Sequence, residues 1–245
     1  MGIRQVNPKT LDGGISSLTQ HNSKEFEDFI YLLSHDIRNS VRALLEVPQW
    51  IQDDLIEAGY RINEPLQENL ALMNIHTRRL DRMLIDLLVY SRAGRMQVVK
   101  EVSISDAIAI VLDQLNMPAG FEIDLDLKCA EIRMGDRDIL TLCSALISNA
   151  IKHHDMSTGK LTISSARKSG DCVLTFSDDG PGIPEKYRER VFEVMTTLKP
   201  RDEIEGSGMG LALVRKIVDI YGGDIKWLSK PSERGTAIQF TFPNG

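Results

Sequence analysis

Apolar residues recur at spacings of four and three in the first third of the chain. The first run, with Ser40 at its one missing step, is Phe26, Ile30, Leu33, Ile37, Leu44, Val47, Ile51 and Leu55. The second run, with Thr77 as its gap, is Leu66, Leu70, Met73, Leu80, Leu84 and Leu87. Such stripes predict two long amphipathic helices. Residues 58–65 would join them into a hairpin.

The predicted hairpin covers residues 24–95, with a helix start at Ser23 and a stop at Gly59. One hairpin buries its apolar stripes poorly, whereas two hairpins forming a four-helix bundle bury them well. We therefore expect a homodimer. Residues 1–23 are polar and contain turn-forming dipeptides, so we expect a flexible leader there.

Residues 100–245 contain both helix-like and strand-like patterns of apolar residues, which predict a second domain of α+β type. Helical stretches are expected at 104–114, 136–154 and 207–221, and strands at 121–127, 161–166, 172–177, 224–228 and 236–242. Several of these strands alternate apolar and polar residues. This alternation predicts a sheet with one face covered by helices.

Composition narrows the class of partner and the compartment. The net charge of −6 argues against nucleic acid, whose phosphates need a basic face. Three scattered cysteines fit buried, reduced thiols better than a disulfide framework or a zinc site. No apolar run reaches the length of a membrane span, and the N-terminus lacks the apolar core of a signal peptide. We expect a cytoplasmic protein with no membrane span in this chain.

Two glycine-containing motifs suggest a nucleotide site. Asp178-x-Gly180-x-Gly182 follows a predicted strand, where a carboxylate can accept a hydrogen bond from an exocyclic amine. Alone, this motif could be an ordinary turn. Gly206-x-Gly208-x-Gly210 opens a predicted helix, where backbone N–H groups can hold phosphate. Its glycines could equally form the hinge of a mobile lid over residues 194–206.

The end of the helix before these motifs adds polar groups. Asn149 offers a neutral oxygen suited to Mg²⁺, and Lys152, one turn later, can reach a phosphate. Both could also be plain surface residues. His153 and His154 are adjacent in a helix and do not face one another, which argues against a transition-metal site.

The order of these motifs, ending with Arg234-Gly235-Thr236, resembles the ATP-binding fold shared by histidine kinases, type II topoisomerases, mismatch-repair ATPases and large heat-shock chaperones. The resemblance implies an α/β sandwich domain that binds ATP and Mg²⁺. In it, Asn149 would hold Mg²⁺, Asp178 would bind the adenine amine, and Lys152 and the lid would contact phosphates. The other nucleotide-binding residues expected are His153, Gly180, Gly182, Ile183, Gly206, Ser207, Gly208, Met209, Gly210, Leu211 and Thr236.

The segment from Ser34 to Asn39 resembles the phosphoacceptor box of histidine kinases. His35 lies between two stripe positions, so its side chain should face solvent. Neutral imidazole is a competent nucleophile, and Asp36 could accept the proton of the other ring nitrogen. In the family, an Asn or Thr at the position of Asn39 orders the water that dephosphorylates the partner receiver domain. Asn39 as a plain solvated residue stays equally open.

We expect an ATP-dependent protein-histidine kinase that phosphorylates His35 and passes the phosphoryl group to a response-regulator aspartate, with phosphatase activity left open. No sensory domain fits in residues 1–23, so a sensory module would be separate or missing. Two alternatives stay open: a histidine phosphotransfer protein with a degenerate nucleotide site, and a non-kinase ATPase clamp. The chain departs from the family pattern at Ser40, Ala145, Met195 and Glu233.

Overall fold

The structure is a computed structural model that describes residues 8–95, 97–200, 203–204, 206–228 and 234–243, with side chains from residue 30 onward. The chain divides into two compact units, and the boundary lies between Ser91 and Arg92.

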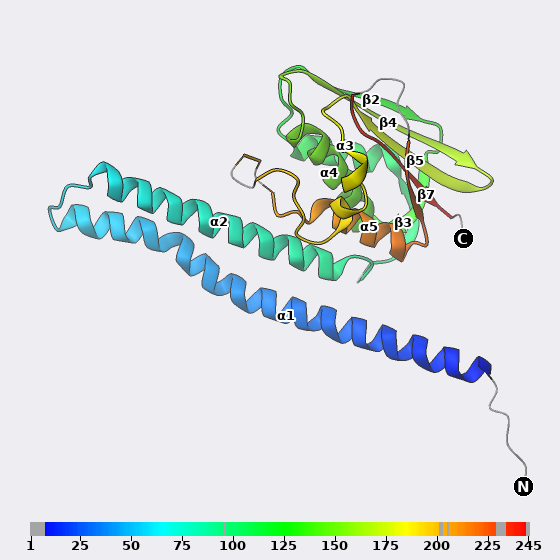
Figure 1. Cartoon of the computed structure of the whole chain (residues 1–245), viewed down its shortest axis with the longest axis horizontal. Helices are drawn as coiled ribbons and strands as arrows, with labels where there is room; N and C mark the ends of the chain where they lie inside the picture. Colours follow the sequence, from blue (N-terminus) through cyan, green and yellow to red (C-terminus); the bar gives the residue numbers. More distant parts are fainter. Residues whose placement is uncertain (1–7, 96, 201–202, 205, 229–233, 244–245) are drawn as a thin grey trace, which may run out of the picture. The chain divides into compact units, whose positions relative to one another are not determined.

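The first unit is a helical hairpin, as the heptad stripes predict (Figure 1). Helix α1 spans Pro8–Glu57 and helix α2 spans Glu64–Arg92. The turn begins at Gly59, whose φ of +78° is in the left-handed region that glycine adopts without strain. The side chain of Asn63 then accepts a hydrogen bond from the Leu66 N–H and caps α2. Along the hairpin, Arg38 and Asp81 join the two helices at 3.2 Å.

Helix α1 begins earlier than Ser23. Residues 8–23 are helical, not the flexible leader expected, while residues 1–7 lie outside the described residues. Pro8 suits the first helical position, where its missing N–H costs nothing. Gly13 and Gly14 weaken a helix by only about 1 kcal/mol each relative to alanine. The helix also continues through Pro48 and is bent (Figure 1), as expected where a proline removes a backbone hydrogen bond.

The second unit combines a five-stranded sheet, a two-stranded sheet and three α-helices. In chain order its elements are β1 Val99–Ser103, α3 Ile104–Gln114, β2 Phe121–Leu127, β3 Glu131–Gly135, α4 Asp136–Lys152, β4 Gly159–Lys168, β5 Asp171–Asp178, α5 Gly210–Ile220, β6 Asp224–Trp227 and β7 Ala237–Phe242. Short 3₁₀ turns cover Glu185–Tyr187 and Arg190–Phe192.

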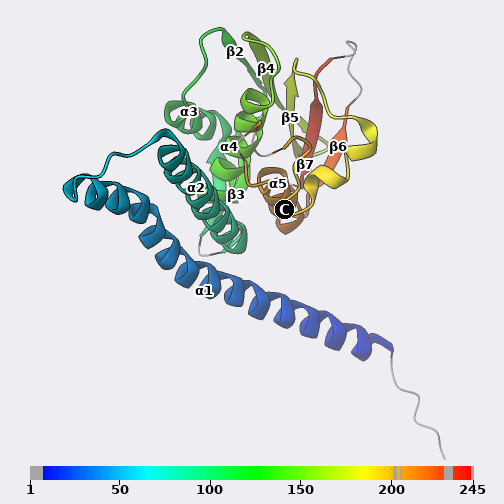
Figure 2. The same ribbon diagram turned by 60° about the vertical axis from the view of Figure 1, so that its left-hand side comes forward.

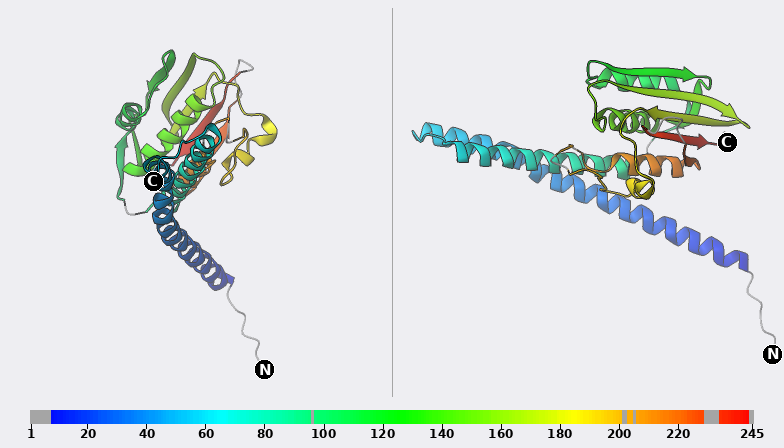
Figure 3. Two further views of the ribbon diagram at one scale, coloured as in Figure 1. Left: turned by 90° about the vertical axis from the view of Figure 1, so that its left-hand side faces the viewer. Right: turned by 45° about the horizontal axis from the view of Figure 1, so that its top comes forward.

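The large sheet has the strand order β2-β4-β5-β7-β6. Strands β2 and β4 are parallel, and the other neighbours are antiparallel. Helices α3, α4 and α5 cover one face of this sheet (Figures 2 and 3). Sheet residues such as Ile163 and Leu174 and helix residues such as Ile139 and Val214 are 0% exposed, so the core lies between the two layers. The predicted α/β sandwich is confirmed.

Strand β2 is one edge of the large sheet. Its side chains Glu122, Asp124 and Asp126 are all exposed. The other edge strand, β6, has four residues. Strands β1 and β3, which were not predicted, pair with each other in antiparallel register.

Candidate nucleotide and phosphoacceptor sites

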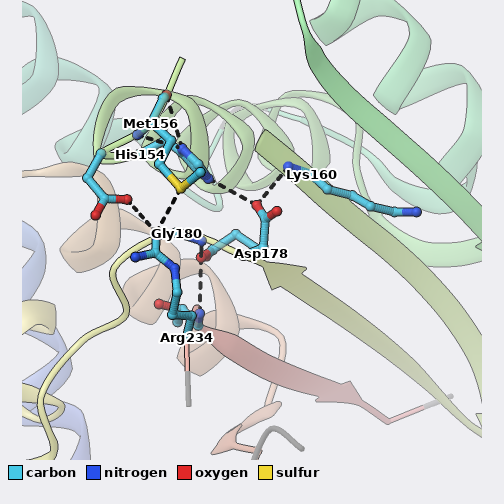
Figure 4. Close-up of polar contacts among 9 residues, drawn as sticks. His154, Met156, Lys160, Asp178, Gly180 and Arg234 are labelled. Atoms are coloured by element: carbon cyan, nitrogen blue, oxygen red, sulfur yellow. Dashed lines mark hydrogen bonds and ion pairs between the residues drawn. The ribbon is translucent and has the colours of Figure 1, made fainter. Parts of the chain in front are cut away.

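Asp178 is the last residue of β5, and its carboxylate is held by two backbone donors. Oδ1 accepts hydrogen bonds from the N–H groups of Gly180 and Thr236, each at 3.0 Å (Figure 4). The backbone N–H of Asp178 in turn donates to the Thr236 carbonyl at 2.9 Å. The fold thus joins Asp178, Gly180 and Thr236, which the sequence analysis assigned to one site. The two donors fix the orientation of the carboxylate.

Gly182 brings the same loop against the last glycine motif. Its φ is +79°, and a Cβ there would lie 2.9 Å from the Gly235 carbonyl oxygen. Only glycine fits this backbone without strain. Ile183 follows it and is half-buried.

Asn149 lies where α4 approaches the start of α5. Ile147 and its apolar neighbours bury one face of α4 in the core, which leaves Asn149 half-buried and Lys152 exposed. A Cβ on Gly210 would lie 3.6 Å from the Asn149 amide nitrogen. The metal-binding candidate therefore lies beside the glycine motif that opens α5.

The loop before α5 is anchored from within. Ser207 and Met209 are buried, and the Ser207 hydroxyl accepts a hydrogen bond from the Met209 N–H at 3.2 Å. Gly208 has a φ of +77°, and a Cβ there would lie 2.6 Å from the Thr196 carbonyl oxygen. The glycine motif thus lies directly against residues 195–196 of the predicted lid. Helix α5 begins at Gly210, three residues after the predicted start, and Leu211 is half-buried.

Positive charge gathers at the end of α4. Lost hydration, followed by the charges of Lys199 and Lys152, holds the pKa of His153 below its usual value. Lys199 belongs to the predicted lid, so two segments distant in sequence supply cations to one region. Such a local field favours the phosphates of a nucleotide.

A buried histidine that the motifs did not predict lies beside this site. The His154 side chain is 3% exposed, and its Nε2 lies 3.0 Å from Asp179 Oδ1. His154 Nδ1 lies 3.2 Å from the Met156 nitrogen and 3.3 Å from the Met156 carbonyl oxygen. His154 thereby ties the end of α4 to the loop that carries Asp178 (Figure 4). The second carboxylate of the Asp178-Asp179 pair indicated that Asp179 needs a partner, but the spacing of residues did not identify His154 as that partner.

Two further contacts fix the surroundings of the loop. Burial tends to raise the pKa of Asp179, but hydrogen bonds from the Lys160 N–H and from His154 outweigh it and hold that pKa below the usual value. Arg234 donates to Asp155 at 2.7 Å and joins the last glycine motif to the segment after α4 (Figure 4).

In the hairpin unit, the His35 side chain is 61% exposed, as predicted from its position between stripe residues. Its Nδ1 lies 3.2 Å from Asp36 Oδ1. This contact leaves Nε2 as the ring nitrogen that can attack an electrophile. Asn39, one turn later, is also exposed.

A metal ion that arrives with a nucleotide fits this residue set. Among the described residues, no group of three His, Cys, Asp or Glu side chains could hold a metal. Mg²⁺ commonly keeps several waters and binds through one or two protein oxygens plus substrate phosphates. The Asn149 amide oxygen can be such a ligand. Glu233, one of the departures from the family pattern, lies outside the described residues.

Comparison with known proteins agrees with this geometry. Residues 135–245 match the family described as histidine kinase-, DNA gyrase B- and HSP90-like ATPase. The adaptive-response sensory kinase SasA of Rippkaea orientalis is 30% identical over 229 residues, which cover 86% of this chain and 56% of SasA. Residues 135–245 of the C-terminal unit are therefore similar to this ATPase family. The whole chain has the sequence features and domain order of a two-component sensor histidine kinase with an ATP-binding catalytic domain.

Two solved structures share the fold. Full-length ShkA in complex with AMPPNP matches 88% of this chain and 45% of its own, with a TM-score of 0.65 and 19% identity. Histidine kinase ThkA in complex with the response regulator TrrA matches 94% of this chain and 66% of its own, with a TM-score of 0.62 and 18% identity.

The chain is much shorter than many of its relatives. It spans 25–30% of the length of four other curated relatives, among them the methanogenesis regulatory histidine kinase FilI of Methanothrix harundinacea. In the described part of the chain, every helix is too short or too polar to cross a membrane.

Proposed function

We propose that this chain is an ATP-dependent protein-histidine kinase that phosphorylates its own His35. One observation carries the proposal: an exposed histidine, with Nδ1 beside a carboxylate, precedes an ATP-binding domain on the same chain. A histidine phosphotransfer protein does not require the fixed Asp178 carboxylate. A clamp-type ATPase does not require an exposed His-Asp pair on a helical hairpin.

Each part of the site has a role in this reaction. Asp178 accepts a hydrogen bond from the adenine amine, and Lys152 and Lys199 attract the phosphates. Mg²⁺, held by Asn149 and the phosphates, would neutralise charge on the transferring group. His35 Nε2 attacks the γ-phosphorus, so that an N–P bond forms and the bond to the ADP oxygen breaks. Asp36 stabilises the Nδ1 proton as the ring becomes cationic.

The partner proposed for the phosphoryl group is an aspartate of a response-regulator receiver domain. Support comes from the ThkA structure, whose partner is a response regulator. Asn39 is exposed on the same helix as His35, where it could order a water that attacks the phosphorylated regulator. We include this phosphatase activity in the proposal.

A second copy of the chain is the other partner. Six of the stripe residues that should face a bundle core are exposed in the single hairpin: Leu33, Ile37, Leu44, Ile51, Met73 and Leu80. Burying apolar surface stabilises association by roughly 25 cal/mol per Å². A four-helix bundle of two hairpins buries this stripe.

Incubation with γ-labelled ATP tests the kinase. The parent should take up acid-labile label, whereas His35→Ala should bind ATP with parental affinity and take up none. Label retained by His35→Ala would place the acceptor elsewhere. ATP hydrolysis without labelled protein would favour the clamp, and absent ATP binding would favour the phosphotransfer protein.

A further inference from the structure

A buried carboxylate holds the first residues of the second unit, just after α2, against the rest of that unit. Asp138, in the first turn of α4, is 3% exposed. Its two carboxylate oxygens accept from the Gly94 N–H, Oδ2 at 3.0 Å and Oδ1 at 3.3 Å, and Oδ2 also accepts from the Tyr221 hydroxyl at 2.7 Å. A buried charge is costly unless donors surround it. These hydrogen bonds therefore hold Gly94 firmly at the start of α4.

Tyr221 completes this arrangement from the end of α5. Its hydroxyl donates to Asp138 and accepts from the Gly135 N–H at 2.9 Å. Burial and the hydrogen bond to Asp138 raise the pKa of Tyr221 to about 12, so the phenol keeps its proton near neutral pH. We call Asp138, Tyr221 and the Gly94 N–H the linker clamp.

The chain around Gly94 fits closely against α5 and α4 of the same unit. Gly94 has a φ of +75°, and a Cβ there would lie 2.9 Å from Ile220 Cγ2 at the end of α5. The side-chain oxygen of Gln97 accepts from the Arg137 N–H at 3.1 Å. Strand β1 then begins at Val99 and pairs with β3. The linker is thus held at Gly94, at Gln97 and from Val99 onward.

We propose that Asp138 and Tyr221 are positioning residues for autophosphorylation. This inference rests on the proposed function. His35 lies in one unit and the nucleotide site in the other, so the rate depends on their effective concentration, which linker length and stiffness set. Opening the linker clamp adds free chain before Gln97, which its bond to the Arg137 N–H still holds. The added freedom lowers the effective concentration of bound ATP at His35.

The linker clamp is remote from the nucleotide site. Helix α4 carries Asp138 near its start and Asn149 near its end, about 16 Å apart at 1.5 Å of rise per residue. Helix α5 runs from Gly210, beside Asn149, to Ile220, which Tyr221 follows. Removing one hydroxyl at the clamp should therefore leave the nucleotide residues in place.

The test compares the full-length parent with Tyr221→Phe, which keeps the ring, and with Asp138→Asn. Hydrogen exchange at the Gly94 amide measures directly how often the linker clamp opens. The exchange rate should rise in both variants, by about tenfold in Tyr221→Phe. The labelling rate at saturating ATP should fall several-fold. The ATP affinity of Tyr221→Phe, measured by calorimetry, should stay within about twofold of the parent, since the rate loss comes from effective concentration.

Gln239→Ala is the matched control, because it removes a single hydrogen bond, to Thr175 in the sheet. It should keep parental Gly94 exchange and labelling. Parental exchange or an undiminished labelling rate in Tyr221→Phe overturns the inference, as does a parallel loss of ATP affinity. If the parent itself takes up no label, the proposed function fails. An active parent with an equally active Tyr221→Phe refutes only the positioning role.

Discussion

Asp178→Asn changes one atom at the centre of the proposed nucleotide site. Oδ1 accepts from two backbone N–H groups, so the asparagine must keep its oxygen there. Its NH₂ group then takes the place of Oδ2. In the proposed complex this NH₂ meets the adenine amine donor to donor, whereas the parent carboxylate accepts from that amine.

The expected loss follows from the cost of an unmade hydrogen bond. Leaving a buried donor without its partner costs about 1–3 kcal/mol. Since about 1.4 kcal/mol is a factor of ten, ATP should bind about 5- to 150-fold more weakly. Folding should change little, because the bonds from Gly180 and Thr236 are retained.

Calorimetry with the full-length chain measures this loss, and Asp179→Asn is the matched control. Asp179 belongs to the same loop, but its Oδ1 accepts from the Lys160 N–H and lies 3.0 Å from His154. Asp179→Asn should therefore bind ATP with near-parental affinity. Inosine triphosphate, which carries a carbonyl in place of the amine, should regain affinity in Asp178→Asn relative to ATP. Parental ATP affinity in Asp178→Asn would refute the placement of the adenine.

Three further predictions address the glycine loop, the pH dependence and the dimer. Gly208→Ala should lower the free energy of unfolding, measured in thermal melts, by about 1–2 kcal/mol, because it combines a positive φ with a clash at Thr196. Gly206→Ala should be tolerated in the same measurement, because a Cβ there would have no atom within 4 Å. The folded-state pKa of Asp179 lies below its unfolded value, so the stability it contributes is complete above about pH 4 and is lost as the pH falls further. The free energy of unfolding should therefore fall less steeply with decreasing pH in Asp179→Asn than in the parent. Leu44→Glu should dissociate the dimer in sedimentation experiments, whereas Leu72→Glu, exposed but outside the stripe, should not; a Leu44→Glu dimer would exclude the proposed bundle.

Local patterns predicted much of the fold. Helix α3 and strand β2 have the predicted bounds, because Ser103 caps the helix and polar residues alternate along the strand. Strands β1 and β3 were missed because pairing between segments distant in sequence stabilises them. Helix α1 was predicted too short because Gly13 and Gly14 suggested a turn, although Leu11, Ile15 and Leu18 continue the four-and-three spacing of apolar residues.

The candidate site likewise has one part that the sequence predicted and one part that it did not. The residues around Asp178 and the glycine loop follow from motifs whose members lie close in sequence. The bonds from His154 to Asp179 and from Tyr221 to Asp138 join residues 25 and 83 positions apart. Such pairs are brought together only when the sheet and helices are packed, so spacing in the sequence carries no signal for them.

The acidic edge of β2 limits how copies of this chain can associate. An open strand edge can recruit a strand from another molecule, and charged side chains along it discourage such pairing. Glu122, Asp124 and Asp126 on this edge, the last two paired with Lys160 and Lys128, are charged side chains that a second β2 would have to desolvate. At the opposite edge, β6 offers only four residues. Self-assembly through sheet extension is thus disfavoured, so the ATP-binding units of two molecules should not pair through these edge strands.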